Sequence, residues 1–108
     1  MTLRSLLTII VLLAGTSSTM ANCYEGLGCD DSENFSSRML QQASCQQLWE
    51  LRNMIFQQNG YCFQTERGKQ AFGTEGCHVT SQAAVQLNAF ETRNVATIAA
   101  VEKAKGCS

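Results

Sequence analysis

The sequence contains no proline and only one histidine, His78. A hydrolytic triad would have to use that histidine, and no serine lies in the G-x-S-x-G pattern of an exposed nucleophile. Structural zinc centres are commonly built on C-x-x-C pairs, and none occurs, although Cys77 directly precedes His78. The sequence therefore indicates no catalytic, metal-binding or cofactor-binding residues. The absence of proline instead suits short helices joined by glycine turns.

Acidic residues are present but show no catalytic pairing. Glycoside hydrolases place two carboxylates about 5–10 Å apart around the scissile bond. The helical glutamates of this chain fall at ordinary surface positions with no spacing that pairs them: Glu50, Glu66, Glu75, Glu91 and Glu102. Three further acids, Asp30, Asp31 and Glu33, form a short run that is typical of solvated surface. We predict a protein without enzymatic activity and keep a small carboxylate-dependent cell-wall hydrolase as the alternative.

The N-terminus has the three parts of an export signal. Arg4 is the only charged residue before Glu25, residues 6–14 form an almost unbroken apolar run, and residues 19–21 read Thr-Met-Ala. A transmembrane helix needs about 20 apolar residues, about twice the length of this run. We therefore predict that residues 1–21 are a cleaved signal peptide. The mature protein is then periplasmic or secreted, without stable insertion in a membrane.

The mature part, residues 22–108, carries seven basic and nine acidic residues, a net charge of −2. This balance gives no electrostatic attraction for nucleic acid or for an anionic membrane surface. All six cysteines lie in this part, and an even number of cysteines in a short exported chain indicates disulfides. Such cross-links stabilise a domain that buries only about 60–65% of its unfolded surface.

Two long helices are predicted from capping boxes. Ser44 with Gln47 begins a helix over about residues 45–58, whose apolar side chains recur every three or four positions until Asn59-Gly60 ends it. The second helix covers about residues 89–105. Its start is a second capping box and its apolar stripe is formed by Phe90, Val95, Ile98 and Val101, with Gly106 as the stop.

The remaining chain is predicted to contain short elements only. Thr65 can cap a brief helix that ends at Phe72-Gly73, and residues 77–87 are expected to be loop or one loose turn. Residues 22–35 read as an irregular N-terminal lobe, because they are polar, acidic and rich in glycine. The helical domain then comprises residues 36–108.

Arg52 and Asn53 lie in the first long helix beside Trp49 and Phe56. Arginine near tryptophan and tyrosine is typical of interface hot spots, so these residues and Tyr61 form a candidate binding motif. In the structural interpretation, Arg52 stacks on an aromatic ring or pairs with a glutamate, and Asn53 caps a neighbouring loop. We favour the structural interpretation, because asparagine costs helix propensity and usually persists in a helix for a hydrogen bond.

Helix geometry narrows the disulfide pairings. The two long helices have similar lengths of about 21–26 Å, and antiparallel packing would bring Cys45 beside Cys107. The cysteines that flank the short helix would then meet at the opposite end. We therefore expect three pairings: Cys45–Cys107, Cys62–Cys77 and Cys23–Cys29. A steep crossing of the helices would instead send Cys107 to one of the N-terminal cysteines.

The segment LWELRNMIFQQNGYCF resembles the central motif of the YARHG-domain family of small exported bacterial proteins, in its cysteine-containing branch. Eight positions match the family pattern: Leu48, Trp49, Arg52, Asn53, Ile55, Gly60, Tyr61 and Phe63. The resemblance covers about residues 36–107. The five namesake positions read Phe-Gln-Gln-Asn-Gly at residues 56–60, so the arginine and histidine of the family are replaced. The resemblance implies fold, compartment and bacterial origin, and it implies no activity.

These observations predict a mainly α fold, a small disulfide-stapled domain of two longer helices with one or two short helices and loops. The predicted function is that of an exported, non-enzymatic binding or envelope-associated module. Its partner is an unknown protein or cell-envelope component. A secreted inhibitor or effector that docks on another protein is a further alternative to the cell-wall hydrolase.

Overall fold

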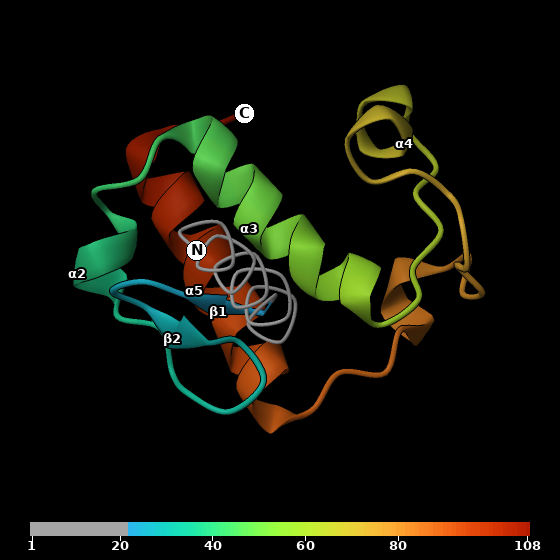
Figure 1. The fold of residues 1–108 in the computed structure, drawn as a ribbon. Coiled ribbons are helices and arrows are strands. Elements are labelled where there is room, and N and C mark those ends of the chain that lie inside the picture. The colour runs from blue at the N-terminus through green and yellow to red at the C-terminus, as the bar shows by residue number, and fades with distance from the viewer. Residues whose placement is uncertain (1–21) are drawn as a thin grey trace, which may run out of the picture.

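The computed structural model describes residues 22–108, whose regular structure is mainly helical, as predicted (Figure 1). The elements in chain order are β1 (Cys23–Tyr24), β2 (Gly28–Cys29), α2 (Ser37–Leu40), α3 (Cys45–Gln58), α4 (Glu66–Phe72), a 3₁₀ turn (Gln82–Ala84) and α5 (Ala89–Lys105). The predicted signal peptide, residues 1–21, lies outside the described residues. Within residues 22–108, no helix combines the length and the apolar character needed to cross a bilayer.

Both long helices begin at the predicted capping boxes. The Ser44 side chain accepts a hydrogen bond from the Gln47 backbone N–H at 3.1 Å, and the Gln47 side chain accepts one from the Ser44 N–H at 2.9 Å. Asn88 and Glu91 exchange the same two bonds at 2.8 and 2.9 Å. These bonds satisfy backbone donors that a helix start leaves free, so the local sequence sets where α3 and α5 begin.

The core lies between α3 and α5, which pack side by side (Figure 1). Leu48 and Ile55 of α3 are fully buried, as is Ile98 of α5, and Val101 is 5% exposed. Phe35 and Leu40 complete this buried cluster from the N-terminal side. Burial of each such side chain contributes about 1.5–3 kcal/mol relative to exposure.

The buried face of α5 differs from the predicted apolar stripe. Its buried residues are Glu91, Asn94, Ile98 and Val101, at spacings of three and four. Phe90 is 36% exposed, because successive residues point about 100° apart around a helix and Glu91 takes the inward position. The prediction that Glu91 is an ordinary surface residue is therefore wrong, and polar side chains occupy half of the buried face.

The N-terminal segment, residues 22–35, is more regular than the predicted irregular lobe. β1 and β2 form a short antiparallel hairpin in which Cys23 lies opposite Cys29. The turn requires glycine at Gly28, where φ is 104°. α2 follows this segment, and its four residues are too few to show a periodic pattern, so the sequence did not predict it.

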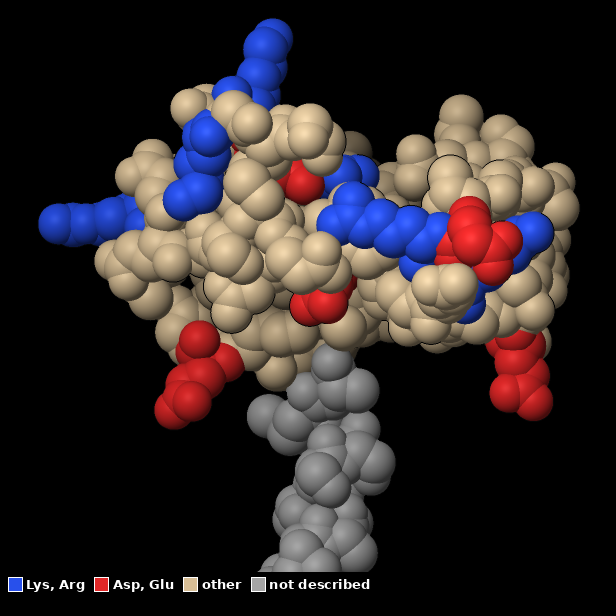
Figure 2. Space-filling view, turned by 90° about the horizontal axis from the view of Figure 1, so that it is seen from above, with Lys and Arg blue, Asp and Glu red and all other residues tan. Residues whose placement is uncertain are grey.

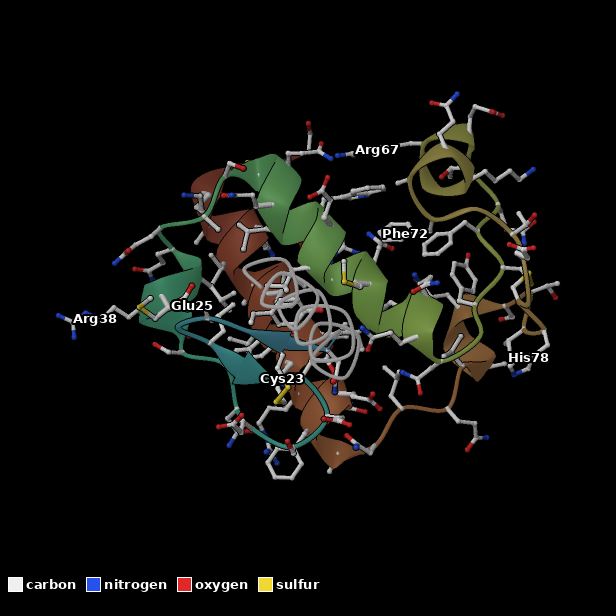
Figure 3. All side chains as sticks on the ribbon, in the orientation of Figure 1. Cys23, Glu25, Arg38, Arg67, Phe72 and His78 are labelled. Carbon is white, nitrogen blue, oxygen red and sulfur yellow. A yellow bond between two sulfur atoms is a disulfide. The ribbon has the colours of Figure 1, made fainter. Side chains whose placement is uncertain are left out.

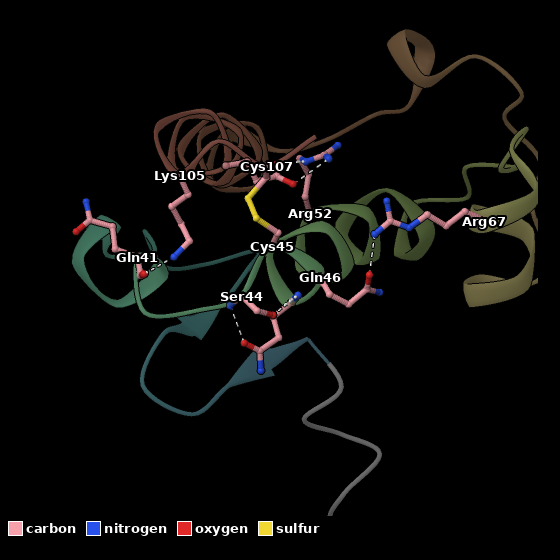
Figure 4. Close-up of a disulfide and its surroundings, with 10 residues drawn as sticks. Gln41, Ser44, Cys45, Gln46, Arg52, Arg67, Lys105 and Cys107 are labelled. Carbon is pink, nitrogen blue, oxygen red and sulfur yellow. Dashed lines mark hydrogen bonds and ion pairs between the residues drawn. A yellow bond between two sulfur atoms is a disulfide. The ribbon is translucent and has the colours of Figure 1, made fainter.

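The three disulfides have the pairings expected from helix geometry. Cys45 and Cys107, with Cα atoms 5.5 Å apart, join the start of α3 to the end of α5 (Figure 4). α3 and α5 are therefore antiparallel, and Cys107 does not reach the N-terminal cysteines. The other two bridges are Cys62–Cys77 and Cys23–Cys29, and no cysteine of residues 22–108 is free.

Candidate interaction site on α3 and α4

Five aromatic rings form a row that connects α3 to the segment carrying α4. The ring centroids of Trp49 and Phe72 are 5.7 Å apart, and Phe63 follows 4.8 Å from Phe72. Tyr61 lies 4.8 Å from Phe63 and 6.2 Å from Phe56. Spacings of about 4.5–7 Å are favourable for aromatic pairs. This aromatic row therefore anchors α4 to α3, and it absorbs Tyr61 of the predicted motif.

Arg67 of α4 stacks on the outermost member of this row. Its guanidinium carbon lies 3.7 Å from the ring centroid of Trp49, within the range of a cation–π interaction. The same guanidinium donates a hydrogen bond to the Gln46 Oε1 atom at 2.7 Å (Figure 4), and Figure 3 shows Arg67 between α4 and α3. Arg67 and Gln46 are exposed, whereas Trp49 and Phe72 are half-buried. We define these four residues as the candidate interaction site.

Arg52 lies outside this site and pairs with Glu102 of α5. Its Nε and Nη2 atoms donate hydrogen bonds to the two carboxylate oxygens at 2.6 and 3.1 Å. The side chains of Arg52 and Glu102 are 25% and 12% exposed, so the pair is partly shielded from water. This contact links α3 to α5, as the structural interpretation of Arg52 expects. Glu102 is correspondingly not an isolated surface carboxylate.

We expect Arg52→Ala to lower the free energy of unfolding by about 1–3 kcal/mol. The substitution removes two charged hydrogen bonds and leaves Glu102 partly buried without its partner. Arg67→Ala is the matched control, because it removes an exposed arginine whose stacking is worth about 0.5–1 kcal/mol. Chemical denaturation measures both changes. An Arg52→Ala midpoint equal to that of the unaltered protein would contradict the structural role.

Asn53 is buried, but it does not cap a neighbouring loop as predicted. Its Nδ2 atom donates a hydrogen bond to the Trp49 carbonyl of the same helix at 2.9 Å. The amide is thus bonded to the carbonyl four residues before it, a local contact that asparagine often makes within a helix. Asn53 therefore supports α3 from within and brings no second element to the predicted motif.

Gly60 stands where no side chain fits. Its φ is 89°, and a Cβ atom built on it would clash with the His78 imidazole ring. The backbone N–H groups of His78 and Val79 donate hydrogen bonds to the Gly60 carbonyl at 2.8 and 2.9 Å. The single histidine thus packs on the backbone that leaves α3. Among residues 22–108, no three His, Cys, Asp or Glu side chains are grouped so as to hold a metal ion.

Asn94, which no sequence motif indicated, connects the N-terminal segment to α5. Its side chain is fully buried, and its Oδ1 atom accepts a hydrogen bond from the Phe35 N–H at 2.9 Å. Its Nδ2 atom donates to the carbonyls of Asp30 and Glu33 at 3.0 and 2.8 Å. Its burial could have been predicted from its position four residues before Ile98, because residues four apart lie on the same face of a helix.

Two acids of the chain are buried rather than solvated. Asp30 is fully buried, so the predicted solvated acidic run is wrong for its first member. Glu91 is 7% exposed, and its carboxylate accepts hydrogen bonds from the Asn88 N–H and, at 3.1 Å, from the Asn59 Nδ2 atom. Because both carboxylates are enclosed by the protein, neither presents an oxygen to a polymeric substrate.

Most of the residues described above lie in a segment that matches a known protein family. The family model described as YARHG domain matches residues 30–103, which include α3, α4, the aromatic row and nearly all of α5. The chain belongs to the YARHG-domain family. No curated protein and no solved structure matches it.

The YARHG domain is a small extracellular domain of unknown function, and it is not a known catalytic family. An oxidising extracellular compartment agrees with the three disulfides of this chain. At the namesake positions of this YARHG domain, Phe56 is buried in the aromatic row and Asn59 donates hydrogen bonds to the Ile55 carbonyl and to Glu91. Gly60, the last of these positions, fits against the His78 ring.

Proposed function

We propose that this YARHG domain is a non-enzymatic docking module that acts outside the cytoplasm and binds a protein of the cell envelope. The observation that supports this proposal is the stacking of exposed Arg67 on half-buried Trp49, beside Phe72. Tryptophan and arginine are enriched among the residues that dominate binding energy at protein interfaces. A side chain already ordered by stacking loses little conformational entropy when a partner binds.

The charge on this face supports a partner that offers carboxylate or carbonyl groups. Figure 2 shows Lys and Arg side chains projecting from both halves of the molecule on this face, with a few Asp and Glu among them. Arg67 is exposed on α4, and an arginine has five N–H donors, of which only one is bonded to Gln46 here. The planar guanidinium can therefore accommodate a carboxylate of the partner.

A small carboxylate-dependent cell-wall hydrolase is the alternative from a different class. Its mechanism would require two carboxylates that reach the scissile bond. Two acids of residues 22–108, Asp30 and Glu91, are buried, so their carboxylates cannot reach a polymeric substrate. A secreted inhibitor or effector would use the same docking face, but its partner would come from another cell.

We expect Arg67→Ala to reduce capture of the envelope partner at least tenfold, which corresponds to a hot-spot loss of about 1.4 kcal/mol or more. The bait is the oxidised exported protein, immobilised and exposed to envelope extract. Lys69→Ala is the matched control, because it removes a similar exposed charge from the same short helix without touching Trp49. The control should bind within about twofold of the unaltered protein.

Three outcomes would contradict this proposal. Arg67→Ala that folds normally and captures the partner undiminished would exclude the candidate interaction site. Release of soluble fragments from cell-wall polymer by the bait would favour the hydrolase. A partner found only in extracts of foreign cells would favour the inhibitor or effector.

A further inference from the structure

Asp30 lies at the point where the N-terminal hairpin is held against the two long helices. Its backbone N–H donates a hydrogen bond to the Asn22 carbonyl at 3.0 Å, and its carbonyl accepts the bond from Asn94 of α5. Its side chain has no exposed surface. The docking of residues 22–35 therefore places a carboxyl group in the interior of the domain.

Among the described residues, the groups around this carboxyl offer few of the hydrogen bonds and none of the positive charge that would stabilise a buried carboxylate. Its Oδ1 atom has no hydrogen-bond partner among residues 22–108. Its Oδ2 atom accepts only a long bond of 3.4 Å from the Tyr24 hydroxyl, which also lies 3.1 Å from the Met54 Sδ atom of α3. The described part of the chain contains one ion pair, Arg52–Glu102, so no cation neutralises Asp30.

Within residues 22–108, the titratable groups around Asp30 include no cation that would stabilise its ionised carboxylate. Tyr24 reaches it from β1, Asp31 is its neighbour in the same loop, and Glu91 approaches from α5. From α3, the Met54 thioether carries no charge. The side chains of Tyr24 and Asn22 favour the ionised form, but a fully buried acid that faces two other acids and, in the described chain, no cation is more stable when it carries a proton.

We propose that Asp30 is a proton-controlled latch: its protonated form holds the N-terminal segment, residues 22–35, against α3 and α5, and its ionised form loosens that segment. The latch acts on a defined unit, because the Cys23–Cys29 bridge keeps the hairpin itself intact when it moves. The buried contacts of Phe35 and Asn94 are the ones that the opening would break.

The pH dependence of docking follows from the difference between the pKa of Asp30 in the docked state and its pKa in the open state. Burial raises the pKa of Asp30 from its ordinary 3.8 to about 6, with the Asn22 side chain opposing the rise and the charges of Glu91 and Asp31 adding to it. Burial and the Asp30 charge raise the pKa of Tyr24 to about 12, so the tyrosine remains a donor throughout. The docked state binds the proton more tightly than the open state. Docking is therefore strongest below about pH 4 and weakens as the pH rises through about 6.

Amide hydrogen exchange of residues 22–35 tests the latch in the oxidised exported protein. After correction for the intrinsic pH dependence of exchange, we expect protection at pH 7.5 to be about tenfold lower than at pH 5. Asp30→Asn should show nearly equal protection at both pH values, because the amide does not ionise. Glu25→Gln is the matched control, since it removes one exposed acid from the same hairpin and should keep the tenfold difference.

A second measurement uses the unaltered protein, so it does not require any variant to fold. The side-chain carboxyl resonance of Asp30 should titrate near pH 6 in the unaltered protein. A midpoint below about 4.5 would overturn the proposal, because the group would then behave like an ordinary solvated aspartate. Equal pH dependence in the unaltered protein and in Asp30→Asn would overturn it as well.

Discussion

Asn94→Ala is expected to lower the free energy of unfolding by about 3–5 kcal/mol, a large part of the stability of so small a domain. The alanine would leave three backbone groups without their partner, the buried N–H of Phe35, the buried carbonyl of Asp30 and the partly buried carbonyl of Glu33. Each unsatisfied buried group costs about 1–3 kcal/mol. The loss should appear in urea unfolding and as lowered amide protection of residues 22–35.

Asn53→Ala is the matched control for this experiment. It removes a buried asparagine of the other long helix, but one whose side chain bonds only to the Trp49 carbonyl of its own helix. Alanine has the higher helix propensity, so the expected loss is about 1 kcal/mol or less. Equal losses in the two variants would show that burial of an amide, rather than its bonds between elements, sets the cost.

Replacing both Cys45 and Cys107 with alanine is expected to destabilise the domain by about 4 kcal/mol in the chain-entropy model. The bridge spans 62 residues, the longest separation of the three, so its removal frees the most conformations in the unfolded chain. It also releases the ends of α3 and α5, the two helices that form the core. Thermal unfolding of the double variant, followed by helical circular dichroism, measures the effect.

The paired replacement of Cys62 and Cys77 is the control for chain length. This bridge spans 15 residues, which corresponds to about 3 kcal/mol, and it lies beside the aromatic row rather than the main core. Its loss should reduce amide protection around α4 while α5 stays protected. A larger loss of stability from this pair than from Cys45 and Cys107 would contradict the assignment of the core to α3 and α5.

Local sequence by itself determined where the two long helices lie in the chain. Ser44 with Gln47 and Asn88 with Glu91 are capping boxes whose bonds form between residues three apart, and Gly106 stops α5 in the left-handed region at φ 75°. Such signals need no tertiary partner. The disulfide pairing was predicted on the assumption that the two long helices pack antiparallel, and the Cys45–Cys107 bridge confirms that packing.

Tertiary structure alone decided which polar side chains became buried. Asn94, Glu91 and Asp30 are polar or charged, and the type of side chain by itself predicts that they are exposed. Asn94 turns inward because the N-terminal segment must satisfy its backbone groups where it meets α5, and a polar side chain at that depth does so. Glu91 turns inward at the start of α5, where its carboxylate accepts bonds from the Asn88 N–H and the Asn59 side chain. Arg52 met Glu102, fifty residues away, for a related reason: two partly buried charges are stable only as a pair. Contacts at such separations leave no periodic trace in one sequence, so the fold was needed to reveal them.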